Sequence, residues 1–112
     1  MKTSFNGFNE QVASFEADSS VAAGKAVGIS ANGKVQAVTS GAFCGVCKKV
    51  KDGIAAVQLA GYVKVPYTGS LSLGWQKVSA TTGSKIAADA SNGREYLIVD
   101  VDSAANIAGI IL

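Results

Sequence analysis

From residue 21 to the C-terminus, the chain alternates short runs rich in valine, isoleucine and alanine with turn signals. Runs of this length and composition are typical of β-strands. No stretch after residue 20 keeps a helical period for three turns. The pattern predicts an all-β chain, with strands at residues 25–30, 34–39, 42–50, 54–65, 75–80, 84–88, 95–102 and 106–112.

Three dipeptides between these runs predict tight hairpins, because both of their residues tolerate the positive φ of a type I′ turn. The run 54–65 is long for one strand, and Gly61 near its centre predicts a bend where the chain changes sheets. Pro66 ends that run and places it at a sheet edge, where a missing N–H is tolerated. The hairpin dipeptides are Asn32-Gly33, Asp52-Gly53 and Asn92-Gly93.

A weak internal repeat suggests two similar β-modules. The stretch "VAAGKAVGISANGKVQAV" lies over "LSLGWQKVSATTGSKIAADA" at an offset of 50 residues, and "AFCGVCKKVKDGIAAVQL" lies over "EYLIVDVDSAANIAGIIL" at an offset of 53. Identity is low, so chance similarity is the alternative. The matched pairs are Gly24 with Gly74, Gly33 with Gly83, Val46 with Val99, Ala55 with Ala108, and Leu59 with Leu112.

The first 20 residues differ from the rest, since they hold three of the four phenylalanines among polar residues. Phe5, Phe8, Val12 and Phe15 follow a helical spacing, but Ala13 and Phe15 also fit the alternation of a strand. A segment with apolar anchors and few partners of its own is typical of an arm that orders on another surface. We therefore expect an N-terminal arm over residues 1–20, with those four residues as partner-binding anchors, and a folded domain over residues 21–112.

Composition agrees with one small globular domain: 112 residues, 48% hydrophobic and only 16% charged. A net charge of +2 is too small to predict a nucleic-acid partner. No apolar run approaches the roughly 20 residues of a membrane span, and no secretory leader is evident. We expect a soluble product of the cytoplasm. A single-domain β-barrel, β-tulip or β-sandwich fits these features.

Candidate chemistry is sparse, because the chain has no histidine and only two cysteines. In an extended strand Cys44 and Cys47 would lie about 10 Å apart on opposite faces, too far for a disulfide or a shared metal ion. A structural zinc site also needs about four ligands. The spacing therefore predicts one buried thiol and one incidental thiol, and we expect neither a metal nor a cofactor.

Two acidic residues and a group of lysines are the charged residues that could form a functional site. Asp100 and Asp102 would share a strand face about 7 Å apart, which suits paired glycosidase carboxylates or a calcium site. Simple alternation, with polar side chains outward and valines inward, is the favoured interpretation. Lys48, Lys49 and Lys51 fit solvated strand positions that discourage edge pairing, or a patch that docks an acidic partner.

The stretches "VAAGKAVGISANGKVQAV", "FCGVCKKVKDGIAAVQLAGYVKVP" and "GREYLIVDVDSAANIAGIIL" resemble the small β-rich capsid decoration, or cement, proteins of tailed bacteriophages. In that family a G-x-x-V strand, an Asn-Gly or similar turn, a Gly-Val strand and a V-x-L-x-G-x-V strand follow in this order. The resemblance covers about residues 20–112. Cys44 and Cys47 depart from the usual composition of the family.

The resemblance implies a structural virion protein, not an enzyme, that binds the outside of an expanded phage head. Its partner would be the major capsid protein, and it would bridge neighbouring subunits as a homo-oligomer, with a trimer favoured. Two rival hypotheses stay open. One is a carbohydrate- or surface-binding module that uses Trp75, Tyr62 and Tyr67, such as the base of a head fibre. The other is a small hydrolase that uses Asp100 and Asp102.

Overall fold

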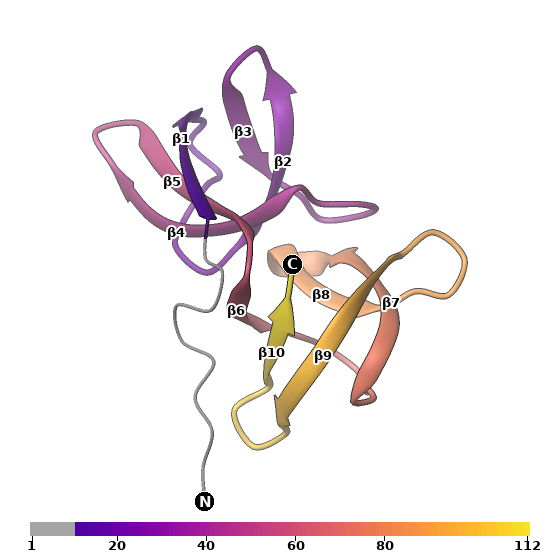
Figure 1. Ribbon diagram of the computed structural model, residues 1–112. Helices are drawn as coiled ribbons and strands as arrows, with labels where there is room; N and C mark the ends of the chain where they lie inside the picture. The colour runs from indigo at the N-terminus through magenta and orange to yellow at the C-terminus, as the bar shows by residue number, and fades with distance from the viewer. Residues whose placement is uncertain (1–10) are drawn as a thin grey trace, which may run out of the picture.

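The structure is a computed structural model that describes residues 11–112 as two groups of β-strands (Figure 1). The first group is a closed five-stranded barrel with the order β1-β3-β2-β4-β5, called here the first barrel. All neighbours in it are antiparallel except β1 and β3, which are parallel. Its strands are β1 (Gln11–Ala17), β2 (Ala26–Ala31), β3 (Lys34–Ala37), β4 (Gly45–Lys51) and β5 (Ile54–Ala60).

The second group is a five-stranded sheet with the order β6-β10-β9-β7-β8, called here the second sheet. A 3-10 turn, η1 (Thr82–Ser84), is the one helical element among the described residues. The all-β prediction is therefore confirmed. The strands of this sheet are β6 (Tyr62–Pro66), β7 (Gly74–Thr81), β8 (Lys85–Ala88), β9 (Arg94–Asp102) and β10 (Ile107–Ile111).

The chain passes from the barrel to the sheet at Gly61, where the predicted bend occurs. Gly61 has a φ of 88°, a left-handed conformation that glycine adopts without steric cost. The run 54–65 is thus two strands, β5 and β6, in different sheets. The C-terminus returns to the same junction, because the Leu112 N–H donates a 2.9 Å hydrogen bond to the Gly61 carbonyl.

The predicted boundary of the arm at residue 20 was wrong, because residues 11–17 form β1 inside the first barrel. β1 pairs with β5 along six positions and with β3 along two. Phe15 and Ala17 pack against the barrel core. The sequence favoured an arm because β1 has no turn-linked partner: its neighbours are β3 and β5, both distant along the chain. Residues 1–10, with Phe5 and Phe8, lie outside the described residues.

The same strand order occurs in both halves, so the predicted repeat exists at the level of topology. Around the barrel the order is β1-β3-β2-β4-β5. The sheet order β6-β10-β9-β7-β8 becomes β6-β8-β7-β9-β10 if its two edge strands, β6 and β8, are joined as in a ring. The parallel contact of β1 with β3 has a counterpart in the parallel bridge between Tyr67 and Ile86. The difference is closure, since this single bridge replaces a full strand pair at β6 and β8.

Pairing registers refine the sequence alignment. Val57 pairs with Cys47, and Ile110 pairs with Ile98, each beside a register shift. The offset of 53 therefore holds for β5 and β10, but β4 matches β9 at an offset of 51. The predicted match of Val46 to Val99 was wrong by two residues, because the β9–β10 turn is two residues longer than the β4–β5 turn.

Two of the three predicted hairpins are present. The β4–β5 turn has positive φ at both Asp52 and Gly53, and the β2–β3 turn has it at Gly33. The segment Asn92-Gly93 is not a hairpin, since it joins β8 to β9 and β7 lies between those strands. Asp89 organises this turn by accepting hydrogen bonds from the Asn92 and Ser91 backbone and the Ser79 hydroxyl, which lower its pKa.

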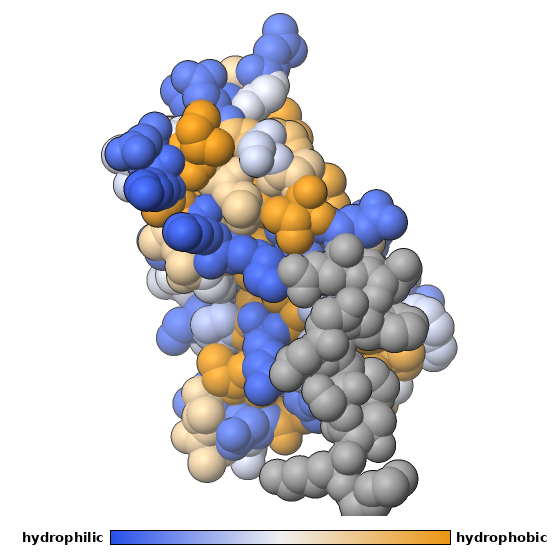
Figure 2. Space-filling model, turned by 60° about the vertical axis from the view of Figure 1, so that its left-hand side comes forward, coloured by the Kyte–Doolittle hydropathy of each residue, from blue (hydrophilic) through white to orange (hydrophobic). Residues whose placement is uncertain are grey.

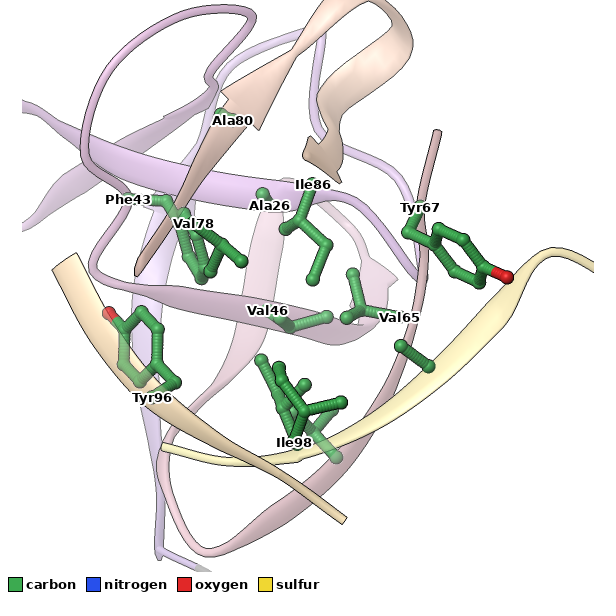
Figure 3. Packing of buried hydrophobic residues seen from close by; sticks show 13 residues of the cluster. Ala26, Phe43, Val46, Val65, Tyr67, Val78, Ala80, Ile86, Tyr96 and Ile98 are labelled. Carbon is green, nitrogen blue, oxygen red and sulfur yellow. The ribbon is translucent and has the colours of Figure 1, made fainter. Parts of the chain in front are cut away.

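The buried core is divided unequally between the two groups of strands. Figure 3 shows the larger of the two clusters. The smaller cluster lies inside the first barrel. The larger cluster fills the second sheet but includes Ala26, Phe43 and Val46 from the first half of the chain. The Phe43 and Tyr96 rings stack with their centroids 5.5 Å apart. The first barrel therefore covers the core that the open sheet cannot enclose, and the radius of gyration of 13.2 Å is that of one compact domain.

Candidate functional site

The surface of the described residues carries large apolar side chains at three separate places. Two places are on the first barrel and one is on the second sheet. Isolated exposed apolar residues are common, so position and neighbours decide what each can do. The residues are Val12 and Leu59, Ile29 and Ile54, and Leu73 and Trp75.

Val12 and Leu59 lie beside each other on β1 and β5. Val12 is 46% exposed and Leu59 39% exposed, and the register shift after Gln11 places Leu59 level with the start of β1. Val12 is the second residue of β1, and Leu59 is the last residue but one of β5. Of the four predicted anchors, Val12 is therefore a surface residue. Phe15 is not, because it packs against the barrel core.

Ile29 and Ile54 lie at the end of the barrel that is formed by two hairpins. The Glu16 N–H donates to the Gly33 carbonyl, and the Ala17 N–H donates to the Gly53 carbonyl, so both turns lie at the end of β1. Ile29 is 57% exposed and Ile54 is 47% exposed. Figure 1 shows both hairpins projecting at the same end of the molecule.

Leu73 and Trp75 lie just before and within β7, and among residues 11–112 they are the two most exposed large apolar residues, at 67% and 69%. Trp75 is also the only tryptophan in the chain. It borders an open groove of about 690 Å³, whose lining mixes aromatic, charged, amide, hydroxyl and methyl groups. The lining residues are Ser72, Trp75, Gln76, Lys77, Ala88, Ala90 and Glu95.

The other two aromatic residues predicted for carbohydrate binding are buried. Tyr67 is 4% exposed and packs in the core of the second sheet. Tyr62 is 6% exposed, and its hydroxyl donates a 3.0 Å hydrogen bond to Asp100 Oδ2. Burial, followed by the hydrogen bond and charge of Asp100, raises the pKa of Tyr62 to about 12. The prediction of a binding face that uses all three aromatic residues is therefore wrong. Of the three, Trp75 alone is exposed enough to stack on a ligand.

Asp100 and Asp102 share the outer face of β9, as the alternation predicted. They pair with Gly109 and Ile107, while Val101 between them packs toward the core. Each carboxylate has a structural partner. Asp100 accepts from Tyr62, and Asp102 Oδ1 accepts 3.1 Å hydrogen bonds from the Ala104 and Ala105 N–H groups in the β9–β10 turn.

The cysteines lie differently from the prediction in one respect. Cys44 precedes β4 and is not within it, so strand alternation does not separate the two side chains. Both thiols contact the core of the first barrel, where Cys47 is buried and Cys44 partly buried. Both are free, and burial raises the pKa of each thiol, which keeps it protonated at neutral pH.

Lysines alternate with apolar residues on the barrel side formed by β1, β4 and β5. Lys48, Lys49 and Lys51 are all exposed, and Lys48 lies at the register shift of β4. Figure 2 shows this side of the molecule, where small apolar patches are separated by hydrophilic side chains. The surface there suits several small contacts more than one continuous apolar interface.

Matched rows of residues on the outer faces of the first barrel and the second sheet differ in how deeply they are buried. In the first barrel, Gln58, Val46 and Ala26 pair across β5, β4 and β2, and all three are at most 1% exposed because the second sheet covers them. The paired positions of the second sheet are Ile111, Leu97 and Trp75. Trp75 is therefore the counterpart of Ala26 in the matched rows. Ala26 is fully buried, whereas Trp75 is 69% exposed.

Sequence reasoning missed part of this surface. Ile29 alternates with Val27 and Leu59 alternates with Val57, a pattern that predicts burial, but Ile29 lies where the barrel ends. Ile54 directly follows the β4–β5 turn at the same end. The groove beside Trp75 joins residues from β7, β9 and the turn after β8, so no local motif could have indicated it. Nothing in the sequence indicates that Trp75 is exposed, since a lone tryptophan is more often part of a core.

The described residues hold neither a metal-type cluster nor a membrane-spanning helix. Among residues 11–112, no three histidine, cysteine or acidic side chains gather as a metal site would require. In the same residues, no helix has the length and hydrophobicity needed to cross a bilayer. Comparison with protein families, curated proteins and solved structures finds no match for the chain.

Proposed function

We propose that this protein is a structural virion protein that binds the outer surface of a tailed-phage capsid. It stabilises the head by bridging neighbouring copies of the major capsid protein. The observation that carries the proposal is the separation of the exposed apolar side chains of the first barrel: Val12 and Leu59 lie at one place, and Ile29 and Ile54 lie at another. A body with several small contact points can touch more than one neighbour on a lattice.

The fold gives such a bridge the stiffness it needs. The first barrel is closed, and the second sheet is held to it by a shared core. Closure removes most of the free strand edges through which β proteins aggregate. The contact points are therefore held at fixed distances from one another, which favours binding to a surface with matching spacing.

Stabilisation of the head would follow from mass action. A protein that binds only the assembled, expanded lattice lowers the free energy of that lattice by RT ln(1 + [L]/Kd) for each site. Each apolar side chain that becomes fully buried contributes roughly 1.5–3 kcal/mol. Individual contacts of this size are weak, but several made together give a large gain in avidity. Oligomerisation on the head, with a trimer favoured, would increase that gain.

The proposal is tested by co-sedimentation with expanded heads that lack the protein, and with unexpanded heads of the same phage. We expect saturable binding to expanded heads, with a fixed number of copies per head, and little binding to unexpanded heads. Val12→Asp and Ile54→Asp should each reduce the affinity at least tenfold, because a charged side chain cannot be buried in an apolar contact.

Ser70→Asp is the matched control, since it adds the same charge at an exposed loop position. It should bind like the unchanged protein. A protein that does not sediment with either kind of head, although its melting curve shows that it is folded, would contradict the proposal.

A further inference from the structure

We propose that the groove beside Trp75 binds a neutral oligosaccharide, a function separate from attachment to the capsid. The groove is open, measures about 690 Å³ and is lined by one indole, one carboxylate, one ammonium, one amide and one hydroxyl side chain, together with two alanines. Small-molecule sites commonly measure roughly 300–1,000 Å³ and combine apolar surface with a few polar groups. This groove falls within that range of volumes, but its lining is open and more polar than apolar, which suits a hydroxyl-rich ligand better than an apolar one.

Trp75 contributes little to the buried core, because most of its surface is exposed. Its counterpart in the first barrel is Ala26, which is fully buried under the second sheet. Trp75 instead leaves 69% of its surface exposed. A large aromatic side chain that contributes little to the core is available for stacking on a ligand. The axial C–H groups of a pyranose ring form a flat apolar face that suits an indole.

Polar groups around the indole suit the hydroxyl groups of a sugar. Lys77 and Glu95 are paired neighbours on β7 and β9, on the same sheet face as Trp75. They provide hydrogen-bond donors and acceptors two residues from the indole along the strand. Gln76 Oε1 accepts a 2.7 Å hydrogen bond from the Ser72 N–H, which ties the loop before β7 to the groove and leaves the amide nitrogen as a donor.

The charges favour a neutral glycan over a nucleic acid or an acidic polymer. One ammonium and one carboxylate line the groove, so its net charge is close to zero. A phosphate-rich ligand needs clustered cations, and the Glu95 carboxylate would repel it. The lysines on the first barrel, Lys48, Lys49 and Lys51, are not among the residues that line this groove.

Because Trp75 is the only tryptophan in the chain, its fluorescence reports directly on binding at the groove. Titration with maltohexaose, cellohexaose and chitohexaose, followed by Trp75 fluorescence, should give a saturable change and a blue shift for at least one of them. A printed array of neutral and acidic glycans extends the panel. Trp75→Ala should weaken binding on the array at least tenfold, and Glu95→Gln should weaken it less.

Leu73→Ala is the matched control, because Leu73 is as exposed as Trp75 but does not line the groove. It should bind glycans normally. Circular dichroism melts of all three variants confirm that they fold. The proposal is overturned if no glycan in the panel binds, if acidic glycans alone bind, or if Trp75→Ala changes only head binding or self-association. Head binding by the unchanged protein is measured separately, so failure here leaves the capsid proposal standing.

Discussion

The first barrel and the second sheet share one strand order but differ in how each encloses its core. The barrel closes through paired β1 and β3, whereas β6 and β8 meet through one bridge. The barrel's matched outer row is buried by the sheet, and the corresponding row of the sheet ends at exposed Trp75. One copy of the repeat therefore uses this face for internal packing, and the other presents it to the outside.

This difference shows that two groups of strands with one strand order can use the same face in different ways, one buried and one exposed. The second sheet depends on Phe43, Val46 and Ala26 from the first half for its core. The second sheet also covers the outer row of the first barrel formed by Gln58, Val46 and Ala26, which would otherwise face solvent. The two modules should consequently fold as one unit, although their topology is repeated.

The largest expected effect comes from removing β1. Deletion of residues 1–17 opens the barrel, removes the pairing to β3 and β5 and removes Phe15 from the core. We expect a protein that fails to fold. Deletion of residues 1–10 keeps every strand of the barrel and should leave a cooperative thermal transition by circular dichroism. A folded 18–112 fragment would show that β1 is dispensable. It would then favour the original prediction of an arm over residues 1–20.

The next largest effect tests the shared core. Phe43→Ala removes the ring that stacks on Tyr96 and should lower the free energy of unfolding by about 3–5 kcal/mol. Guanidinium denaturation should give the same midpoint by Trp75 fluorescence, which reports on the second sheet, and by circular dichroism, which reports on both modules. Separate midpoints would show that the modules unfold independently.

Gly109→Ala should have a smaller, local effect that distinguishes the modules. A Cβ at Gly109 would lie 2.5 Å from Tyr62 Oη and 2.6 Å from Asp100 Oδ1. The hydrogen-bonded pair must shift, at a cost of about 1–3 kcal/mol in unfolding free energy. The equivalent residue of the first barrel is Ala56, which already carries a Cβ. Unchanged stability in urea would mean that the Tyr62 ring moves away without cost.

The smallest expected effect is a dependence on alkaline pH. Because the fold raises the pKa of Tyr62 from 10.0 to about 12, the neutral phenol contributes stability that is complete below pH 10. That contribution is lost as the pH rises from 10 to about 12. Melting temperatures measured over this range should therefore fall less steeply in Tyr62→Phe than in the unchanged protein. Parallel curves would assign the loss to other groups.

Local patterns were enough to predict most strands, the Gly61 bend and the β4–β5 turn, because alternation and positive-φ dipeptides act over a few residues. They did not predict β1, whose partners are distant in sequence. Nor did they separate exposed Trp75 from buried Tyr62 and Tyr67, since burial depends on which module covers which face. The groove depends on the same long-range packing.

The claim that the protein stabilises a phage head is tested most directly by heating expanded heads at a series of concentrations of the free protein. If binding is specific to the assembled lattice, the temperature at which the heads dissociate should rise with the logarithm of free protein concentration above Kd. Val12→Asp should shift the curve to higher concentration, and Ser70→Asp should not. A dissociation temperature that does not change with saturating amounts of folded protein would contradict the account.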